Sequence, residues 1–444
     1  MPLLQKQLAV AIIFALGANS AQFVQAQEEI DPDSKWLTPQ PAFGQQGQPY
    51  PKPPEPTPDF YFADQATTRN GQQVARVLDS AVDTLLESGE LDEWDEYELE
   101  SLARELGNLA PGRVGAVLEQ LAGSQNANLG TATQDSMKQL NSSLLSAMRQ
   151  LSDDRNVSDG AGNGRVWLQA LGDTGKLDGQ HGSAGLDRRT KGLVLGGDWA
   201  VNDAWRVGLV GAKSASDLSA KRFKGDLDSW HLGGYAVRQD GPMALRLGAI
   251  YSNHAGQTKR AVDFDFDFVD YREQAKGKYN AQSQNAFAEM GYQLDKGSFS
   301  VEPFAGVGYQ RYHRESYKEK GGFTALNVGT QTQENLNSTF GLRMASAFEL
   351  NNRMTLKPHL STSWKHLYGD VDSSVRQSSA WVKRPTFNSG FSIEGTSLDR
   401  DSLALHTGLD LALSAQQTVG LAYTAEVGSN THQQGLMGNW RMAF

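Results

Sequence analysis

Residues Leu403–Leu413 read LALHTGLDLAL, with an apolar residue at almost every second position. Thr407 is the one weak position on the apolar face, whereas the opposite face carries mostly small or polar residues. Successive side chains of a β-strand point to opposite faces, so a period of two predicts a strand with one apolar face. Strands in soluble sandwiches are typically about five or six residues long. The greater length of Leu403–Leu413 is typical of a strand that crosses a membrane.

The same alternation recurs after Gly160, where glycine also becomes frequent. Further clear examples are Leu245–Tyr251, Val301–Tyr309, Leu356–Trp364 and Val419–Val427. Membrane barrels place aromatic residues at the membrane interfaces, so aromatic side chains near strand ends are expected to form girdles. The residues with this pattern are Trp199, Trp205, Trp230, Tyr235, Tyr251, Tyr292, Tyr309, Trp364, Tyr423 and Trp440.

The connections between these segments alternate between very short and long. The short ones contain residues that form tight turns, and they are Val201–Ala204, Gln239–Pro242, Asp295–Ser298, Asn351–Arg353 and Ala415–Gln417. The long polar ones lie near Thr174–Arg189, Leu218–Gly225, Gly256–Lys278, Arg314–Thr332 and Asp370–Arg400. Short turns on one side and long loops on the other are typical of bacterial outer-membrane barrels. A soluble sandwich has no reason to sort its loops in this way.

The predicted fold is therefore mainly β, a twelve-stranded antiparallel transmembrane β-barrel formed by residues 160–444. Residues 387–395 (FNSGFSIEG) could form a thirteenth strand. Barrels of this class have an even number of strands. We therefore place residues 387–395 in the loop before Ser402, as a small hairpin.

Residues 1–26 are predicted to be a secretory signal peptide, cleaved between Ala26 and Gln27. Lys6 supplies the positive charge, and the apolar run Leu8–Ala18 is shorter than the roughly 20 residues that a membrane-spanning helix needs. Cleavage nearer Ala21 is the alternative. Residues 27–70 are predicted to be a short exported segment or spacer. Nine of the fifteen prolines fall within this segment, and proline-rich chains favour extended conformations without a core.

Residues 71–151 show helical spacing of apolar residues. The last predicted helix is Thr133–Leu151, with apolar residues along one side and polar residues along the other. Its polar side is assigned to Gln134, Lys138, Asn141 and Ser142. One interpretation is a helical bundle that caps a larger domain, and the other is a helix that fills a polar channel.

Composition excludes several classes of function. The net charge of −10 argues against a nucleic-acid partner held by a basic surface, and the absence of cysteine excludes thiolate chemistry. His181–Gly185 (HGSAG) lacks the strand–turn–helix context of a serine nucleophile. We therefore expect no enzyme activity, no cofactor and no metal. A calcium site formed by Asp263, Asp265 and Asp267 is a less favoured alternative to a simple hairpin that extends above the membrane.

Four segments together resemble the translocator domain of the classical monomeric autotransporters, which belong to type V secretion. They are Val114–Leu129, Gly164–Gly172, Phe391–Asp401 and Leu436–Phe444. The resemblance implies a twelve-stranded barrel in the outer membrane of a Gram-negative bacterium, with a helix threaded through its pore. It also implies that the barrel mediates export of an N-terminal passenger to the cell surface.

The resemblance assigns roles to further residues and partners. The pore helix is expected to meet lumen-facing charges at Arg246, Arg343, Lys357, Lys365 and Glu426. The C-terminal strand is expected to be read by the outer-membrane assembly machinery through four residues on one face, which are Leu436, Trp440, Met442 and Phe444. The general secretion machinery, periplasmic chaperones and outer-membrane lipid are the other expected partners, and the barrel is expected to be monomeric.

The expected passenger differs from that of most family members, because only residues 27–70 precede the helical segment in this sequence. Asn141 lies where some members cut the pore helix, but its surroundings do not match well enough to predict cleavage. An outer-membrane pore or surface adhesin with a periplasmic helical segment is the alternative function.

Overall fold

The computed structural model describes residues 61–88, 97, 100, 103–104, 106–153, 164–265, 270–350, 354–380 and 389–444. The chain divides into two units, Met1–Pro54 and Glu55–Phe444, and every described residue belongs to the second. The predicted signal peptide, its cleavage site at Ala26 and Gln27, and most of the proline-rich segment lie outside the described residues.

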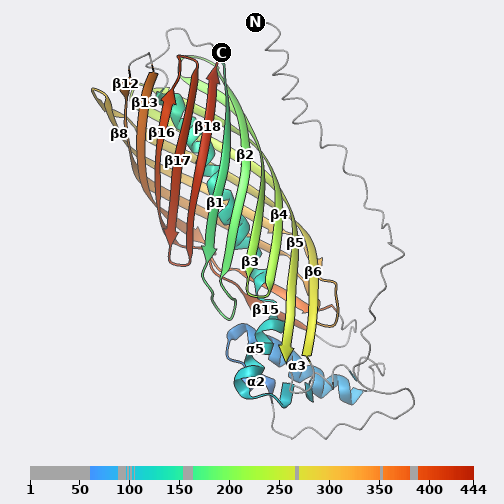
Figure 1. Ribbon diagram of the computed structural model, residues 1–444. Helices are drawn as coiled ribbons and strands as arrows, with labels where there is room; N and C mark the ends of the chain where they lie inside the picture. The colour runs from blue at the N-terminus through green and yellow to red at the C-terminus, as the bar shows by residue number, and fades with distance from the viewer. Residues whose placement is uncertain are drawn as a thin grey trace, which may run out of the picture. The chain divides into compact units, whose positions relative to one another are not determined.

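Twelve long antiparallel strands close into a barrel (Figure 1). They are β1 (Gly164–Leu177), β2 (Leu186–Ala200), β3 (Trp205–Ala220), β4 (Phe223–Asp240), β5 (Met243–Asp265), β6 (Asp270–Tyr292), β8 (Phe299–Arg314), β11 (Gln331–Ser346), β13 (Met354–Gly369), β16 (Asp401–Ala412), β17 (Gln417–Gly428) and β18 (Thr431–Ala443). Each pairs with its neighbours along this sequence, and β18 pairs with β1 to close the ring. Two short strands, β7 (Leu294–Lys296) and β12 (Phe348–Leu350), extend tight turns. The predicted strand number and fold are confirmed.

Alternation along each strand separates an apolar outer surface from a small or polar interior. On β16, Leu403 is 58% exposed whereas Asp410 is buried. The outer surface also carries Trp230 and Tyr251, in agreement with the predicted girdles. Tyr235 is a correction, because it is buried inside the barrel. Its position on β4 has the opposite parity to that of Trp230, so the two side chains point to opposite faces.

Two of the five predicted long loops prove to be mostly strand, and half of a third, Thr174–Arg189, is strand. Strands β5 and β6 stay paired as far as Asp265 and Asp270, so most of Gly256–Lys278 is strand. Only Lys221 and Arg222 separate β3 from β4. Strand β1 likewise runs to Leu177. In these extended parts of the strands the outward-facing residues are polar rather than apolar, although buried and exposed positions still alternate.

The remaining two long connections form a separate four-stranded sheet at the same end of the barrel. Its strands are β9 (Tyr317–Lys318), β10 (Leu326–Val328), β14 (Ser374–Ser379) and β15 (Gly390–Glu394). Strand β15 pairs with β14 and with no barrel strand. The placement of the described part of residues 387–395 outside the barrel is therefore confirmed.

The described helices are α2 (Phe62–Gln65), α3 (Arg69–Ser88), α5 (Pro111–Ala122) and α6 (Gln125–Asp153). Pro111 begins α5, and Gly123 ends it with a left-handed φ of 57°, which lets the chain turn directly into α6. Two predicted boundaries need correction. Helical structure begins before residue 71, since α2 starts at Phe62 and α3 at Arg69. Asp79 of α3 accepts hydrogen bonds from the backbone N–H groups of Phe62 and Ala63, which joins α2 to α3. The predicted helix Thr133–Leu151 is only part of α6, since the polar residues before Thr133 obscured its start.

Helix α6 runs inside the barrel, and the other helices pack at the end that carries the long connections (Figure 1). Phe62, Leu78 and Leu118 belong to one apolar cluster with barrel-end residues such as Leu177 and Phe223. No described helix is long and apolar enough to cross a membrane.

Candidate functional site in the barrel lumen

The apolar side of α6 packs against one wall of the barrel. Met137, Leu140, Leu144 and Met148 are buried, at helical spacing, against residues of β1 to β5. The wall residues in this cluster are Trp167, Val194, Val210, Ala212, Tyr235, Val237 and Ile250. The helix is therefore held to one side of the lumen by apolar contact.

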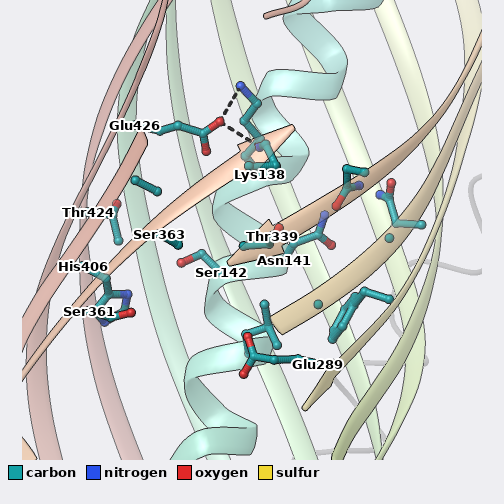
Figure 2. Close-up of a pocket in the computed structure, with 18 of the residues that line it drawn as sticks. Lys138, Asn141, Ser142, Glu289, Thr339, Ser361, Ser363, His406, Thr424 and Glu426 are labelled. Carbon is teal, nitrogen blue, oxygen red and sulfur yellow. Dashed lines mark hydrogen bonds and ion pairs between the residues drawn. The ribbon is translucent and has the colours of Figure 1, made fainter. Parts of the chain in front are cut away.

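The polar side of α6 faces a cavity of about 220 Å³ (Figure 2). Of the residues predicted for this side, Lys138, Asn141 and Ser142 line the cavity. Gln134 lies nearer the N-terminus of α6, where its Nε2 donates to Gln333 Oε1 at 2.6 Å. The opposite wall of the cavity consists of β6, β8, β11, β13, β16 and β17.

Lys138 forms the main electrostatic contact across this cavity (Figure 2). Its Nζ lies 2.8 Å from Asp135 and 3.1 Å from Glu426. Lys365 on β13 also contacts Glu426, at 2.8 Å. Of the predicted lumen charges, Glu426 contacts Lys138 on the polar side of the helix, and Lys365 contacts Glu426. Lys357 lies on the same face of β13, opposite Asp410 of β16.

A second ionic cluster lies nearer the end with short turns. Arg149 of α6 contacts Glu289 at 2.7 Å. Arg246 lies 3.2 Å from Glu289 and 2.6 Å from Glu302. Arg343 reaches the same two carboxylates at 3.3 and 2.6 Å. Buried charges are tolerated when they are paired, so three arginines and two glutamates join the helix to the wall. The sequence predicted that Arg246 and Arg343 face the lumen, but no local pattern predicted which carboxylates they contact.

A third network, missed by sequence reasoning, surrounds Asp198. Arg165 contacts its carboxylate at 2.8 Å, and Tyr235 donates to it at 2.7 Å. Trp167 in turn donates to the Tyr235 hydroxyl at 2.8 Å. Arg165 also donates to the backbone oxygen of Ala147 in α6, at 2.9 Å. The alternation of β1 and β4 could have indicated that Trp167 and Tyr235 face inward.

A fourth network fixes the N-terminal end of α6. The Asn126 side chain donates to Gln377 at 2.8 Å and to Glu319 at 3.2 Å. Tyr317 donates to Asn126 Oδ1 at 3.0 Å, and Arg314 donates to its backbone oxygen at 2.9 Å. Apart from Arg314 at the end of β8, these partners come from connections without a periodic pattern, so no sequence pattern indicated them.

The four C-terminal residues assigned to assembly share the outward face of β18. Leu436 and Phe444 are exposed, and Trp440 and Met442 are half-buried. Phe444 exchanges backbone hydrogen bonds with Gly164, at 2.9 and 3.1 Å, where the barrel closes. A Cβ at Gly164 would lie 2.6 Å from the Phe444 ring, so any other residue there would displace the ring.

The described residues contain no group of three or more His, Asp or Glu side chains that could hold a metal ion. The polar contacts in the lumen are ion pairs and hydrogen bonds, and several of them join α6 to the barrel. Their chemistry is suited to holding a helix in a polar channel.

Comparison with known proteins agrees with this geometry. The family model of the autotransporter β-domain matches residues 166–424. An extracellular serine protease of Serratia marcescens is 28% identical over 318 residues, which cover 71% of this chain and 29% of that protein. A second extracellular serine protease of that organism is also 28% identical, over 316 residues. The chain thus spans under a third of the length of these relatives.

Among solved structures, the translocator domain of the autotransporter NalP from Neisseria meningitidis has the same fold. The match has a TM-score of 0.50 and 16% identity, and covers 70% of this chain and 99% of NalP's domain. The assignment of the chain to a family rests on the family model, because that model covers more than half of the sequence. The chain therefore belongs to the autotransporter β-domain family, and its barrel is an outer-membrane translocator domain of a Gram-negative bacterium.

Proposed function

We propose that this barrel exports its own N-terminal region to the cell surface and retains α6 as the pore helix. The direction of α6 carries the proposal. Its first residue contacts the connection between β1 and β2, where Gln125 Nε2 donates to Ala184 at 2.7 Å. Its last turns contact the opposite end, where Gln150 donates to Asp410 at 3.0 Å. The chain before α6 thus emerges at the end with long connections.

In bacterial barrels, short turns face the periplasm and longer loops face the exterior. By that rule, α2, α3 and α5 lie at the extracellular end. Residues 1–26 then act as the signal peptide, with cleavage before Gln27, and residues 27–70 are the exported segment or spacer. The helical segment before the barrel supplies the pore helix and the external helices.

We further propose that the chain reaches the outer membrane by the route that is usual for such barrels. The general secretion machinery carries the chain to the periplasm, chaperones protect it there, and the assembly machinery inserts it as a monomer. Leu436, Trp440, Met442 and Phe444 form the strand that this machinery reads. A translocator barrel is not itself a catalytic fold, and the proposal includes no enzymatic role for the rest of the chain.

The lack of cysteine allows a direct test with single-cysteine variants. Thr84 is exposed on α3, and Gln416 is exposed in the tight turn between β16 and β17. Intact cells that carry Thr84→Cys or Gln416→Cys are treated with a membrane-impermeant maleimide, before and after the outer membrane is permeabilised.

Export predicts that Thr84→Cys is labelled in intact cells, whereas Gln416→Cys is labelled only after permeabilisation. Labelling of Thr84→Cys only after permeabilisation would overturn the proposal and favour the alternative, a pore with a periplasmic helical segment. Ser142→Cys, which lines the lumen cavity, reports whether the pore itself admits the reagent.

A further inference from the structure

A row of lysines crosses the outer surface of the barrel at its extracellular end. Lys224 of β4 lies directly opposite Lys259 of β5, which lies opposite Lys276 of β6. Lys276 in turn forms an isolated bridge with Lys320, and each backbone N–H donates to the other's carbonyl at 2.8 Å. Four like charges thus stand side by side. All four side chains are exposed.

Two more lysines enlarge this row. Lys278 and Lys318 lie two residues from Lys276 and Lys320 along the same backbone segments, and both are exposed. Residues two apart in an extended segment point to the same face. Two acidic side chains lie beside the row on β4, Asp226 opposite Gln257 and Asp228 opposite Ala255. None of these lysines forms an ion pair with a described residue.

Such an arrangement has a physical cost. Like charges directly opposite each other on neighbouring strands destabilise a sheet. Such a cluster of positive charge is also unexpected in a chain whose net charge is −10. On the adjacent wall the pattern differs, because Lys176 stands opposite Asp187 and Arg189 stands opposite Asp217. An anionic partner outside the barrel would offset the repulsion in the row.

The height of the row above the membrane indicates which anionic partner the lysines meet. Lys224 lies six residues beyond the exposed Trp230 on the same face of β4. At roughly 3.3 Å per residue and a tilt of about 40°, the row stands about 15 Å above the aromatic girdle. It faces radially outward, continuous with the lipid-facing surface. The outer leaflet of a Gram-negative outer membrane consists of lipopolysaccharide, whose core sugars and lipid carry phosphates.

We propose that this lysine row binds the phosphorylated saccharide of outer-leaflet lipopolysaccharide. Lys224, Lys259, Lys276 and Lys320 donate to phosphate oxygens through charge-assisted hydrogen bonds. The glycolipid then orients the β5–β6 hairpin at the membrane surface. This interaction is separate from the lumen and from export.

The test uses the full chain, folded in detergent, and a row variant that combines Lys224→Gln, Lys259→Gln, Lys276→Gln and Lys320→Gln. The matched control combines Lys176→Gln, Arg189→Gln, Lys191→Gln and Lys213→Gln, which removes the same charge from β1–β3. Binding is measured to lipopolysaccharide with a phosphorylated core, to the same material after dephosphorylation, and in competition with inorganic phosphate at matched ionic strength.

Wild type is expected to bind the phosphorylated glycolipid, and the row variant about tenfold more weakly or worse, since four cationic contacts to an anionic lipid are removed. The control should stay within about twofold, because Lys176 and Arg189 already face acids. Lys191 and Lys213 stand opposite uncharged residues and not opposite other lysines. Equal binding of the dephosphorylated glycolipid, equal loss in both variants, or displacement by phosphate alone would each overturn the proposal.

Thermal stability gives an independent readout. Without glycolipid the row variant should be at least as stable as wild type, because repulsion is removed. With glycolipid the order should reverse, since only wild type gains stability from the bound partner. A row variant that is less stable under both conditions would contradict the proposed role.

Discussion

Arg149 of α6 donates from Nη2 to Glu289 Oε2 of β6 at 2.7 Å, across 140 positions of the chain. The contact is one edge of an ionic cluster in which Glu289 also meets Arg246 and Arg343. It joins the helix to the barrel at a point where the two side chains are only 15% and 6% exposed.

Glu289→Ala should destabilise the folded barrel more than Arg149→Ala. Loss of Glu289 removes the carboxylate that Arg149 contacts, and leaves Arg246 and Arg343 with Glu302. Breaking a buried pair in this way costs about 3–5 kcal/mol. Loss of Arg149 leaves Glu289 paired with two arginines. The measurement is the temperature at which each variant loses its heat-modifiable mobility on a gel, and a larger effect for Arg149→Ala would refute the prediction.

Leu144→Ala should loosen α6 within the lumen. Leu144 is fully buried against the wall formed by β1–β5, and truncation of such a leucine costs about 2–5 kcal/mol. Ser142→Ala, on the cavity side, is the control and should change the melting temperature little. Protease sensitivity of α6 in the folded barrel provides the second measurement. Equal effects of the two substitutions would mean that the apolar side does not anchor the helix.

Asn126→Asp should weaken the N-terminal end of α6 more than Asn126→Ala. The aspartate would place a carboxylate oxygen where Nδ2 now lies, 3.2 Å from Glu319. Like charges at that distance repel strongly in a buried site. Hydrogen exchange of the first turns of α6 should therefore accelerate in both variants, and further in Asn126→Asp. Unchanged exchange in Asn126→Asp would show that this network does not hold the helix.

Deletion of Phe444 should leave secretion into the periplasm intact but lower the amount of heat-modifiable barrel in outer-membrane fractions. The residue pairs with Gly164 at the closing seam and lies on the outward face proposed as the assembly signal. Fractionation followed by gels of heated and unheated samples provides the measurement. Unchanged barrel levels would remove the case for an assembly signal.

Strand number and the sorting of connections could be predicted because they depend on local patterns. Leu403–Leu413 alternates because one face meets lipid and the other the lumen, and this constraint acts on each strand separately. Strand ends were less predictable. Beyond the membrane the outer face of β5 and β6 becomes polar, so Gly256–Lys278 resembles a loop although it is paired.

The sequence by itself determined the barrel, its inside and outside, and some of the charged residues that face the lumen, because the period of a strand is a local property. Tertiary structure alone decided which of those charges meet. Glu289 finds Arg149 only because ring closure and the register of β6 bring it to the level of that turn of α6. The same applies to Lys224, Lys259, Lys276 and Lys320, which are scattered in sequence and become neighbours only through strand register.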